Sequence, residues 1–271
     1  MTRTEKTIAF RALHVPGDPF VLPNPWDLGS AKMLTALGAK ALATTSSGHA
    51  FTLGRPDMGN VSRDEALEHA AAISGAVDVP VSGDFENGFG PEPETVAETV
   101  RLAAEAGLAG ISIEDTNLPE TGAYSFEHAV ARIEAAVEAA KAADIVLCAR
   151  ADGWMNRAYD AAEAVRRCQA FAEAGAEVIY APLVKEDTIR ELCTIGPAVN
   201  VLAAGKTTQY SIAQLAEMGA ARISIGGTLA RLTHLTILNA ARAMLEDGDL
   251  SMLGQAASGS EIDALLASTA R

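Results

Sequence analysis

The sequence predicts a (β/α)₈ barrel, because eight strand-like runs alternate with Ala-rich helical stretches along its 271 residues. Eight such units in a chain of roughly 250 residues are typical of this fold. In chain order, the expected strands are residues 20–23, 41–46, 79–84, 110–114, 145–150, 177–181, 200–204 and 222–225. Runs such as 145–147 are apolar throughout, as expected for parallel strands that are covered on both faces.

The helical stretches between these strands carry recognisable start and end signals. Four of them end in a glycine, which adopts the left-handed conformation at low cost and turns the chain into the next strand: Gly38, Gly107, Gly175 and Gly219. Two helix starts have the spacing of a capping box: Ser62 with Glu65, and Thr95 with Glu98. A doubly wound open sheet is the alternative fold, but no G-x-G-x-x-G motif follows the first strand.

Composition indicates one soluble domain over residues 1–271, with residues 250–271 as a C-terminal helical extension, since no linker or low-complexity tract divides the chain. The net charge of −14 and the lack of a Lys/Arg stripe argue against nucleic acid as a partner. No 18-residue apolar run and no secretory leader is present, so we expect a cytoplasmic protein that does not bind membranes. Three unpaired cysteines are expected to be reduced.

Acidic residues at two strand ends suggest a metal site. Asp84 and Glu86 follow one strand, and Glu114 with Asp115 ends the next. Residues two apart in a strand share a face, so Asp84 and Glu86 are expected to converge while Phe85 faces away. Carboxylates without His or Cys suit Mg²⁺ or Mn²⁺. A single acid of this kind could simply cap a turn, but two clusters favour the metal.

Other strand ends contribute polar groups to the same expected pocket, because the loops after barrel strands hold the active site. Ser46, Ser47 and Gly48 could present hydroxyls and amides to an anion, or could form an ordinary serine-rich turn. Asp57 follows a proline in the next loop. Arg150 could grip a substrate carboxylate, or could pair with Asp152 or Glu114. His14, His69 and His128 are expected on loop or helix surfaces.

Five motifs, taken in order, resemble the isocitrate lyase/phosphoenolpyruvate mutase superfamily: P-N-P-W-D, T-T-S-S-G-H-A with L-G-R-P-D, G-D-F-E-N-G-F-G, I-S-I-E-D and A-R-A-D. They cover residues 24 to 231 with their surroundings, most of the chain. The resemblance implies a (β/α)₈ barrel whose last helix is often exchanged between subunits, giving homodimers or homotetramers. It also implies Mg²⁺ and an enolate formed from a 2-oxo or 2-hydroxy acid.

The resemblance assigns roles residue by residue. Asp84, Glu86 and Glu114 match the metal carboxylates, although many members have Asp where Glu86 stands. Ser47, Gly48 and His49 match the stretch that holds the substrate carboxylate, bordered by Trp26 and Thr45. Asp57 matches an acid in the loop after the second strand, and Arg150 matches the arginine that grips the substrate.

The loop that carries K-K/R-C-G-H in the isocitrate and methylisocitrate lyases of the family reads N-L-P-E-T-G-A-Y here. Without the cysteine, Tyr124 or Glu120 would have to supply the proton if the loop closes. Ala204 replaces an amide that would bind the larger substrate. Cleavage of tricarboxylates is therefore not expected, and the loop also lacks the residues associated with phosphonate chemistry.

Three functions are compatible with these motifs. The first is a Mg²⁺-dependent lyase or decarboxylase for a small 2-oxo or 2-hydroxy dicarboxylate. The second is an enzyme of P–C bonds that acts on phosphonopyruvate. The third is a barrel that binds a small acid without turning it over, or that holds phosphate at the A-A-G-K-T and I-G-G-T loops.

Overall fold

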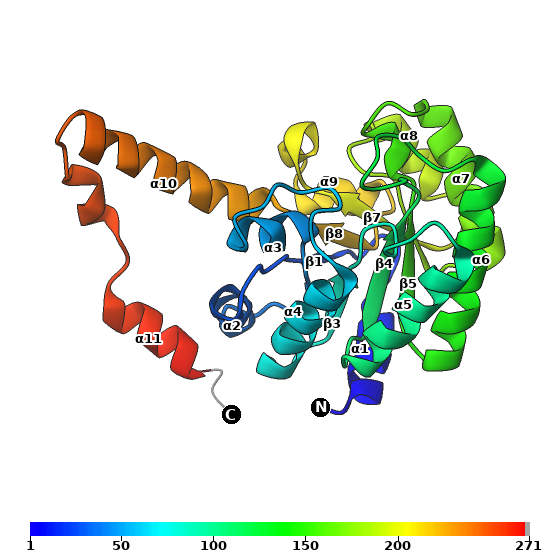
Figure 1. The fold of residues 1–271 in the computed structure, drawn as a ribbon, viewed down its shortest axis with the longest axis horizontal. Coiled ribbons are helices and arrows are strands. Elements are labelled where there is room, and N and C mark those ends of the chain that lie inside the picture. The colour runs from blue at the N-terminus through cyan, green and yellow to red at the C-terminus, as the bar shows by residue number, and fades with distance from the viewer. Residues whose placement is uncertain (269–271) are drawn as a thin grey trace.

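A computed structural model describes residues 1–268 and contains eight parallel strands in one sheet (Figure 1). Their order is β1-β8-β7-β6-β5-β4-β3-β2. The strands are β1 (Phe20–Leu22), β2 (Leu42–Ala43), β3 (Val81–Asp84), β4 (Gly110–Glu114), β5 (Val146–Arg150), β6 (Val178–Tyr180), β7 (Ala198–Leu202) and β8 (Arg222–Ser224). The predicted (β/α)₈ barrel is confirmed.

The first two strands close the barrel through hydrogen bonds rather than through a regular ladder. The Ala43 amide donates to the Pro23 carbonyl at 3.0 Å. The Asn24 side-chain amide donates to the Thr44 carbonyl at 2.9 Å, and its oxygen accepts from the amides of Ile225 and Gly226. Asn24 therefore joins the ends of β1, β2 and β8 at the mouth.

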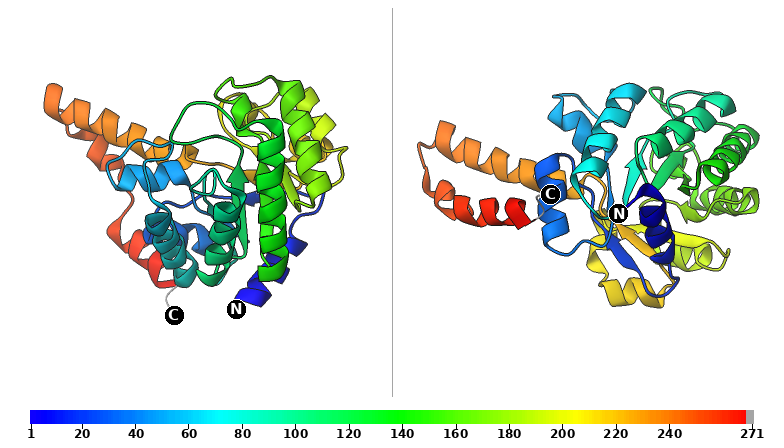
Figure 2. Two further views of the ribbon diagram at one scale, coloured as in Figure 1. Left: turned by 45° about the vertical axis from the view of Figure 1, so that its right-hand side comes forward. Right: turned by 90° about the horizontal axis from the view of Figure 1, so that it is seen from below.

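Helices surround the barrel, and one precedes it (Figure 2). The α-helices are α1 (Arg3–Ala12), α2 (Leu28–Ala36), α3 (Ser46–Thr52), α4 (Arg63–Ala76), α5 (Pro93–Glu105), α6 (Phe126–Ala143), α7 (Ala161–Ala174), α8 (Glu186–Leu192), α9 (Ile212–Glu217), α10 (Thr228–Glu246) and α11 (Gly259–Ser268). Three short 3₁₀ turns, η1 (Asp152–Trp154), η2 (Gly205–Gln209) and η3 (Ser251–Gln255), lie between them.

Most local signals of the sequence act as expected. The four glycines at helix ends have φ between 86° and 106°, and Ser62 with Glu65 forms a capping box. The Thr95 prediction was wrong: α5 begins earlier, at Pro93, so Thr95 lies inside the helix. The second strand was predicted too long, because Thr45 already caps α3. The seventh lies two residues earlier than predicted because Ala198 and Val199 pair with β6.

Two apolar clusters fill the molecule. A smaller cluster inside the barrel includes Phe10, Phe20 and Leu22, so α1 closes the end opposite the mouth. A larger cluster lies between the strands and the surrounding helices. Phe85 belongs to this outer cluster and is fully buried, as the sequence predicted. Cys148 and Cys168 are buried, and all three cysteines are free thiols.

The helix α10 leaves the barrel as an arm, and α11 folds back to contact α2 (Figures 1 and 2). Along α10, several large apolar side chains are more than half exposed: Leu232, Leu235, Ile237, Leu238 and Leu245. Residues 269–271 of the predicted extension lie outside the described residues. Within residues 1–268, no helix is both long enough and apolar enough to cross a membrane.

Candidate active site

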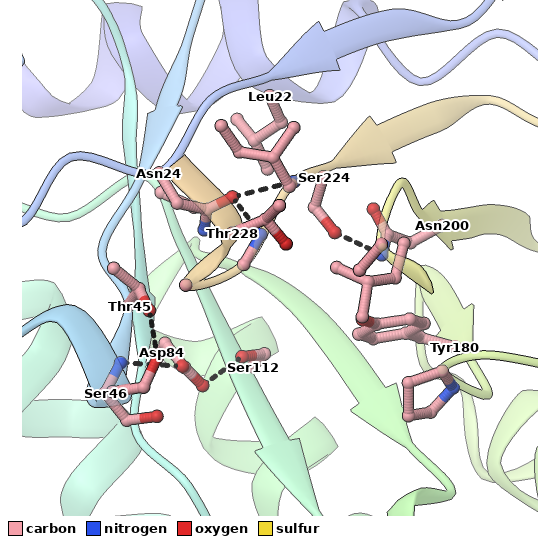
Figure 3. Close-up of a pocket in the computed structure, with 18 of the residues that line it drawn as sticks. Leu22, Asn24, Thr45, Ser46, Asp84, Ser112, Tyr180, Asn200, Ser224 and Thr228 are labelled. Atoms are coloured by element: carbon pink, nitrogen blue, oxygen red, sulfur yellow. Dashed lines mark hydrogen bonds between the residues drawn. The ribbon is translucent and has the colours of Figure 1, made fainter. Parts of the chain in front are cut away.

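A pocket of about 200 Å³ opens at the carboxyl ends of the strands. It is smaller than the roughly 300–1,000 Å³ typical of sites for drug-sized ligands, which favours a small substrate. Figure 3 shows Ser46, Asp84 and Ser112 on one side, and Tyr180, Asn200 and Ser224 on another. All six line the pocket, together with Asp57 and Arg150.

Arg150, at the end of β5, lies at the centre of the acidic side. Its guanidinium contacts Asp84 at 2.7 Å, Glu114 at 3.1 Å and Asp152 at 2.6 Å. Its pairing with Asp152 and Glu114 is the structural alternative that the sequence left open. Burial alone would lower the pKa of Arg150, but the three carboxylates raise it well above its ordinary value. Arg150 is therefore charged.

Asp84 and Asp57 are the acids that border the pocket itself. One oxygen of Asp84 accepts from the Ser46 amide at 2.9 Å, and the other pairs with Arg150. Asp57, in the loop after α3, lies close enough to hydrogen-bond the Ser46 hydroxyl. Burial raises the pKa of Asp57, and the negative charge of Asp84 adds to this effect. Asp57 can therefore hold a proton more readily than a solvated carboxyl group.

Glu86 lies beside this group, although not by the predicted strand periodicity. It follows the end of β3 and has φ of 46°, so the alternation of strand side chains does not reach it. Its carboxylate accepts from the Gly59 amide at 2.9 Å. Burial raises its pKa to about 7, with added repulsion from Asp84 and Asp57. Asp84 and Glu86 are thus near enough to repel each other, but strand periodicity is not the reason.

Burial and mutual repulsion also act on the deeper acids. Burial, followed by the charge of Asp152, raises the pKa of Glu114 well above its ordinary value. In residues 1–268, no three His, Cys, Asp or Glu side chains are arranged to hold a metal ion directly. The guanidinium of Arg150 lies between Asp84 and Glu114 instead. Of the three carboxylates predicted as ligands, Asp84 and Glu114 are brought together around this cation, whereas Glu86 is held by the Gly59 amide.

Asp115 faces the opposite side of β4 from Glu114 and has a separate network. It accepts from the amides of Asp152 and Gly153, from the Tyr159 hydroxyl at 2.6 Å and from Arg167 at 2.8 Å. The side chain of Asp115 is fully buried, and that of Arg167 is 6% exposed. Asp115 thus fixes η1 and the backbone of Asp152, whose carboxylate pairs with Arg150.

The stretch predicted to hold the substrate carboxylate forms the first turn of α3. Thr45, Ser46 and Ser47 line the pocket. The amides of Gly48 and His49 already donate to Thr45, at 3.3 and 3.0 Å, so neither is free for an anion. A Cβ on Gly48 would lie 2.6 Å from the Thr45 methyl and 2.9 Å from Trp26. Gly48 is therefore required for packing.

Trp26 and His49 lie behind this turn and do not line the mouth. The rings of His49 and His69 are stacked, with centroids 3.8 Å apart, and His69 contacts the Trp26 carbonyl at 2.9 Å. The expectation that His69 is solvated was wrong, because α4 packs it against α3. Burial lowers the pKa of His49 to about 4, so this ring is neutral at pH 7.

Tyr124, the proposed acid of the gate loop, lies outside the pocket. Its hydroxyl accepts from Asn87 at 3.4 Å, and its ring stacks under Arg132 at 4.2 Å. Glu120 is exposed at the loop tip. A catalytic role for Tyr124 would need residues 117–124 to move, and it stays a prediction.

The sequence did not single out the side of the pocket formed by β6, β7 and β8. Tyr180 lies 5.3 Å below the guanidinium of Arg150, measured to the ring centroid. Asn200, Arg222 and Ser224 form a buried polar chain beside it. No motif marked these residues, because each lies in an otherwise apolar run. The available signal was one polar residue in β7, Asn200, and two polar residues at period 2 in β8, Arg222 and Ser224.

Comparison with known proteins identifies the family of this chain. The model of the family described as phosphoenolpyruvate phosphomutase matches residues 10–245. The chain belongs to this family. A 2,3-dimethylmalate lyase of Eubacterium barkeri is 33% identical over 211 residues, 73% of this chain and 72% of that protein. The predicted membership of the isocitrate lyase/phosphoenolpyruvate mutase superfamily is confirmed, as is an enzyme of the lyase or mutase class.

Two further proteins match nearly the whole chain. An uncharacterized protein of Mycobacterium tuberculosis is 33% identical over 245 residues, 89% of this chain and 90% of its own length. A crystal structure from Burkholderia cenocepacia J2315, described as a candidate lyase/mutase, has 42% identity and a TM-score of 0.91. It covers 97% of this chain, and this chain covers 95% of it.

Proposed function

We propose that this enzyme is a Mg²⁺-dependent lyase that cleaves a C–C bond of a small 2-oxo or 2-hydroxy dicarboxylic acid through an enolate. The observation that carries the proposal is the surplus of carboxylates around Arg150, beside the hydroxyls of Ser46 and Ser47. The small pocket and the relationship to a dimethylmalate lyase support it.

The donor set fits a hard divalent cation in its chemistry. Asp84, Glu86 and Glu114 would hold the ion, and burial raises the pKa of both glutamates in its absence. An added cation relieves this repulsion, and Mg²⁺ or Mn²⁺ prefers such oxygen ligands. The ion would supply positive charge that stabilises an enolate.

The remaining residues would bind and orient the substrate. Arg150 would exchange one of its carboxylate partners for a substrate carboxylate, which its planar fork can grip through two hydrogen bonds. Ser46 and Ser47 would donate hydrogen bonds from their hydroxyls to the same substrate carboxylate. Asp57 borders the pocket with a raised pKa and is therefore better placed than Tyr124 to transfer a proton.

A P–C bond reaction of phosphonopyruvate is the second candidate, because the matching family model is described as phosphoenolpyruvate phosphomutase. The site has a cation, hydroxyls and carboxylates that could serve either chemistry. The two candidates differ in product, so direct assay separates them.

The test is a panel of oxaloacetate, substituted malates and phosphonopyruvate with saturating Mg²⁺, followed by product analysis. We expect C–C cleavage of a small dicarboxylate. Isocitrate and methylisocitrate should not be cleaved at an ordinary kcat of about 1–10³ per second, because no cysteine is available in residues 117–124 and Ala204 offers no amide. Turnover of phosphonopyruvate alone would reject the lyase.

We further propose a homodimer or homotetramer in which α10 and α11 are exchanged between subunits, in the cytoplasm. The arm of α10 supports this, since it carries Leu235, Ile237 and Leu238 more than half exposed. Such a row of apolar side chains is more typical of an interface than of a free surface. Light scattering of the purified protein at micromolar concentration should give a multiple of 28.1 kDa.

A further inference from the structure

The charged residues that line the pocket are distributed unevenly. Asp57 and Asp84 lie beside Arg150, whereas Arg222 and Arg231 lie on the side of β8 and α10. On that second side, the described lining residues include no carboxylate. A substrate with two anionic ends would therefore meet a different environment at each end.

Arg222, inside the barrel on β8, is a buried cation without a carboxylate partner. It is 4% exposed, and no ion pair within 4 Å in residues 1–268 includes it. Its neighbours are Asn200, the Cys148 thiol at 2.9 Å and His14 at 3.4 Å. Burial raises the pKa of Cys148 and lowers that of His14 to about 3, so both are neutral at pH 7.

A buried guanidinium whose contacts are all neutral leaves an uncompensated positive charge, which is costly unless an anion approaches. The pocket is the route by which such an anion could come, since Arg222 contributes to its floor. The uncapped N-terminus of the 19-residue helix α10 borders the same side and adds partial positive charge.

The hydrogen bonds from Arg222 have a fixed direction. Arginine can only donate, so Asn200 must present its oxygen to Nε of Arg222, at 2.8 Å. The Asn200 nitrogen is then the donor to Ser224 Oγ, at 2.9 Å, as Figure 3 shows. Because Ser224 accepts this bond, its own proton is free to be donated.

Tyr180 lines the pocket on the same side as Ser224, and burial raises the pKa of its hydroxyl. Tyr180 is therefore protonated as well. Ser224, which accepts from Asn200, thus keeps one O–H group for a ligand, and the Tyr180 hydroxyl adds a second donor. Both residues line the pocket.

We propose that Ser224 and Tyr180, backed by Arg222 through Asn200, form the subsite for the second carboxylate of the substrate, opposite the end gripped by Arg150. This assignment rests on the proposed function for the identity of the substrate, but the subsite can be tested by binding alone. It selects dicarboxylates over monocarboxylates with the same 2-hydroxy acid head. Arg222 and Asn200 act as positioning residues.

The test compares binding of malate and lactate to the full chain with Mg²⁺, by isothermal titration calorimetry. The two acids share the 2-hydroxy carboxylate and differ in the second carboxylate. The wild type should bind malate at least tenfold more tightly. Ser224→Ala and Arg222→Met should reduce this ratio to about threefold or less, with the Kd of lactate changed less than about twofold.

Ser112→Ala is the matched control, since Ser112 lines the pocket on β4 and donates to Asp84 at the opposite end, so its loss should affect malate and lactate equally. It should keep the wild-type ratio. If Arg222→Met does not fold, Ser224→Ala decides. A wild type without preference for malate, or a Ser224→Ala protein that keeps it, would overturn the subsite.

Failure of the subsite and failure of the proposed function are distinguishable. Turnover of a dicarboxylate together with an unchanged malate-to-lactate ratio in the variants would reject the subsite and keep the lyase. Loss of the ratio in the variants, with no turnover of any acid by the wild type, would support the subsite and reject the lyase.

Discussion

Glu114 and Asp115 are adjacent in the chain, yet they belong to two ion-pair networks of different character. The fully buried carboxylate of Asp115 accepts from four donors, including Arg167. Glu114 has the Thr116 hydroxyl and a share of Arg150, which also serves Asp84 and Asp152. In the network of Asp115, outside the barrel, the carboxylate has a full set of donors. In the network of Arg150, at the mouth, the carboxylate oxygens outnumber the donors.

The difference separates stability from function. A carboxylate whose donors are all supplied by the protein stabilises the fold and has nothing to offer a ligand. A group of carboxylates that share one guanidinium repel one another, and they are relieved when a cation binds. The mouth network therefore costs stability in the absence of a ligand, as active sites often do.

The largest expected effect is on activity, from Asp84→Ala at the mouth. We expect a loss on the order of a thousandfold in kcat, because a metal contributes several kcal/mol to stabilising developing charge. Thermal stability should stay the same or rise, since one repelling charge is removed. EDTA should likewise abolish activity, and Mg²⁺ or Mn²⁺ should restore it. Full turnover in EDTA, or an unfolded variant, would contradict the assignment.

The satisfied network should respond in the opposite sense. Arg167→Met leaves Asp115 charged and buried, so we expect the free energy of unfolding to fall by about 3–5 kcal/mol. Urea denaturation would measure this. The double variant with Asp115→Asn should recover part of the loss, because the unpaired charge is gone. If Arg167→Met lowered kcat but left the free energy of unfolding unchanged, Arg167 would instead belong to the active site.

Arg150→Lys tests the one cation at the centre of the mouth. Lysine keeps the charge but loses the planar fork, so kcat/KM should fall roughly ten- to a hundredfold, or about 1–3 kcal/mol. The urea midpoint serves as the control for stability. Unchanged kinetics would mean that Arg150 only braces the carboxylates.

The smallest effect concerns pH and Glu86, whose pKa is raised to about 7 chiefly by burial. The folded protein binds this proton more tightly than the unfolded chain does, so protonation stabilises the fold. In EDTA, this stability should be present below about pH 4.5 and decline as pH rises through 7. As the pH rises, the melting temperature of Glu86→Gln should decline less than that of the wild type. If the two plots of melting temperature against pH were parallel, Glu86 would not be the cause.

The sequence predicted the barrel and the acidic side because both depend on local signals. Strand ends, helix-terminal glycines and short motifs occur within a few residues of one another, and the fold brings successive strand ends together. Pairing of Arg150 with Asp152 follows from this reasoning and is observed. β7 lies two residues earlier than predicted and α5 also starts earlier, so such signals identify an element but do not fix its boundaries.

The hydrogen-bonded chain from Arg222 to Ser224 could not be predicted in this way. Its meaning depends on which groups surround a guanidinium in three dimensions, and above all on the missing carboxylate. His69 is a similar case, since its contact with His49 arises between two helices. The role of these side chains depends on their contacts with residues of other helices and strands, and residue type alone does not reveal it.

The arm formed by α10 begins at the pocket, because Thr228 and Arg231 of its first two turns line the mouth. The same helix carries the exposed leucines farther out. A contact that holds the outer end of α10 in place would also fix the orientation of its first turns at the pocket. Assembly and catalysis would then be thermodynamically linked, so that dilution weakens substrate affinity and a bound dicarboxylate tightens the assembly.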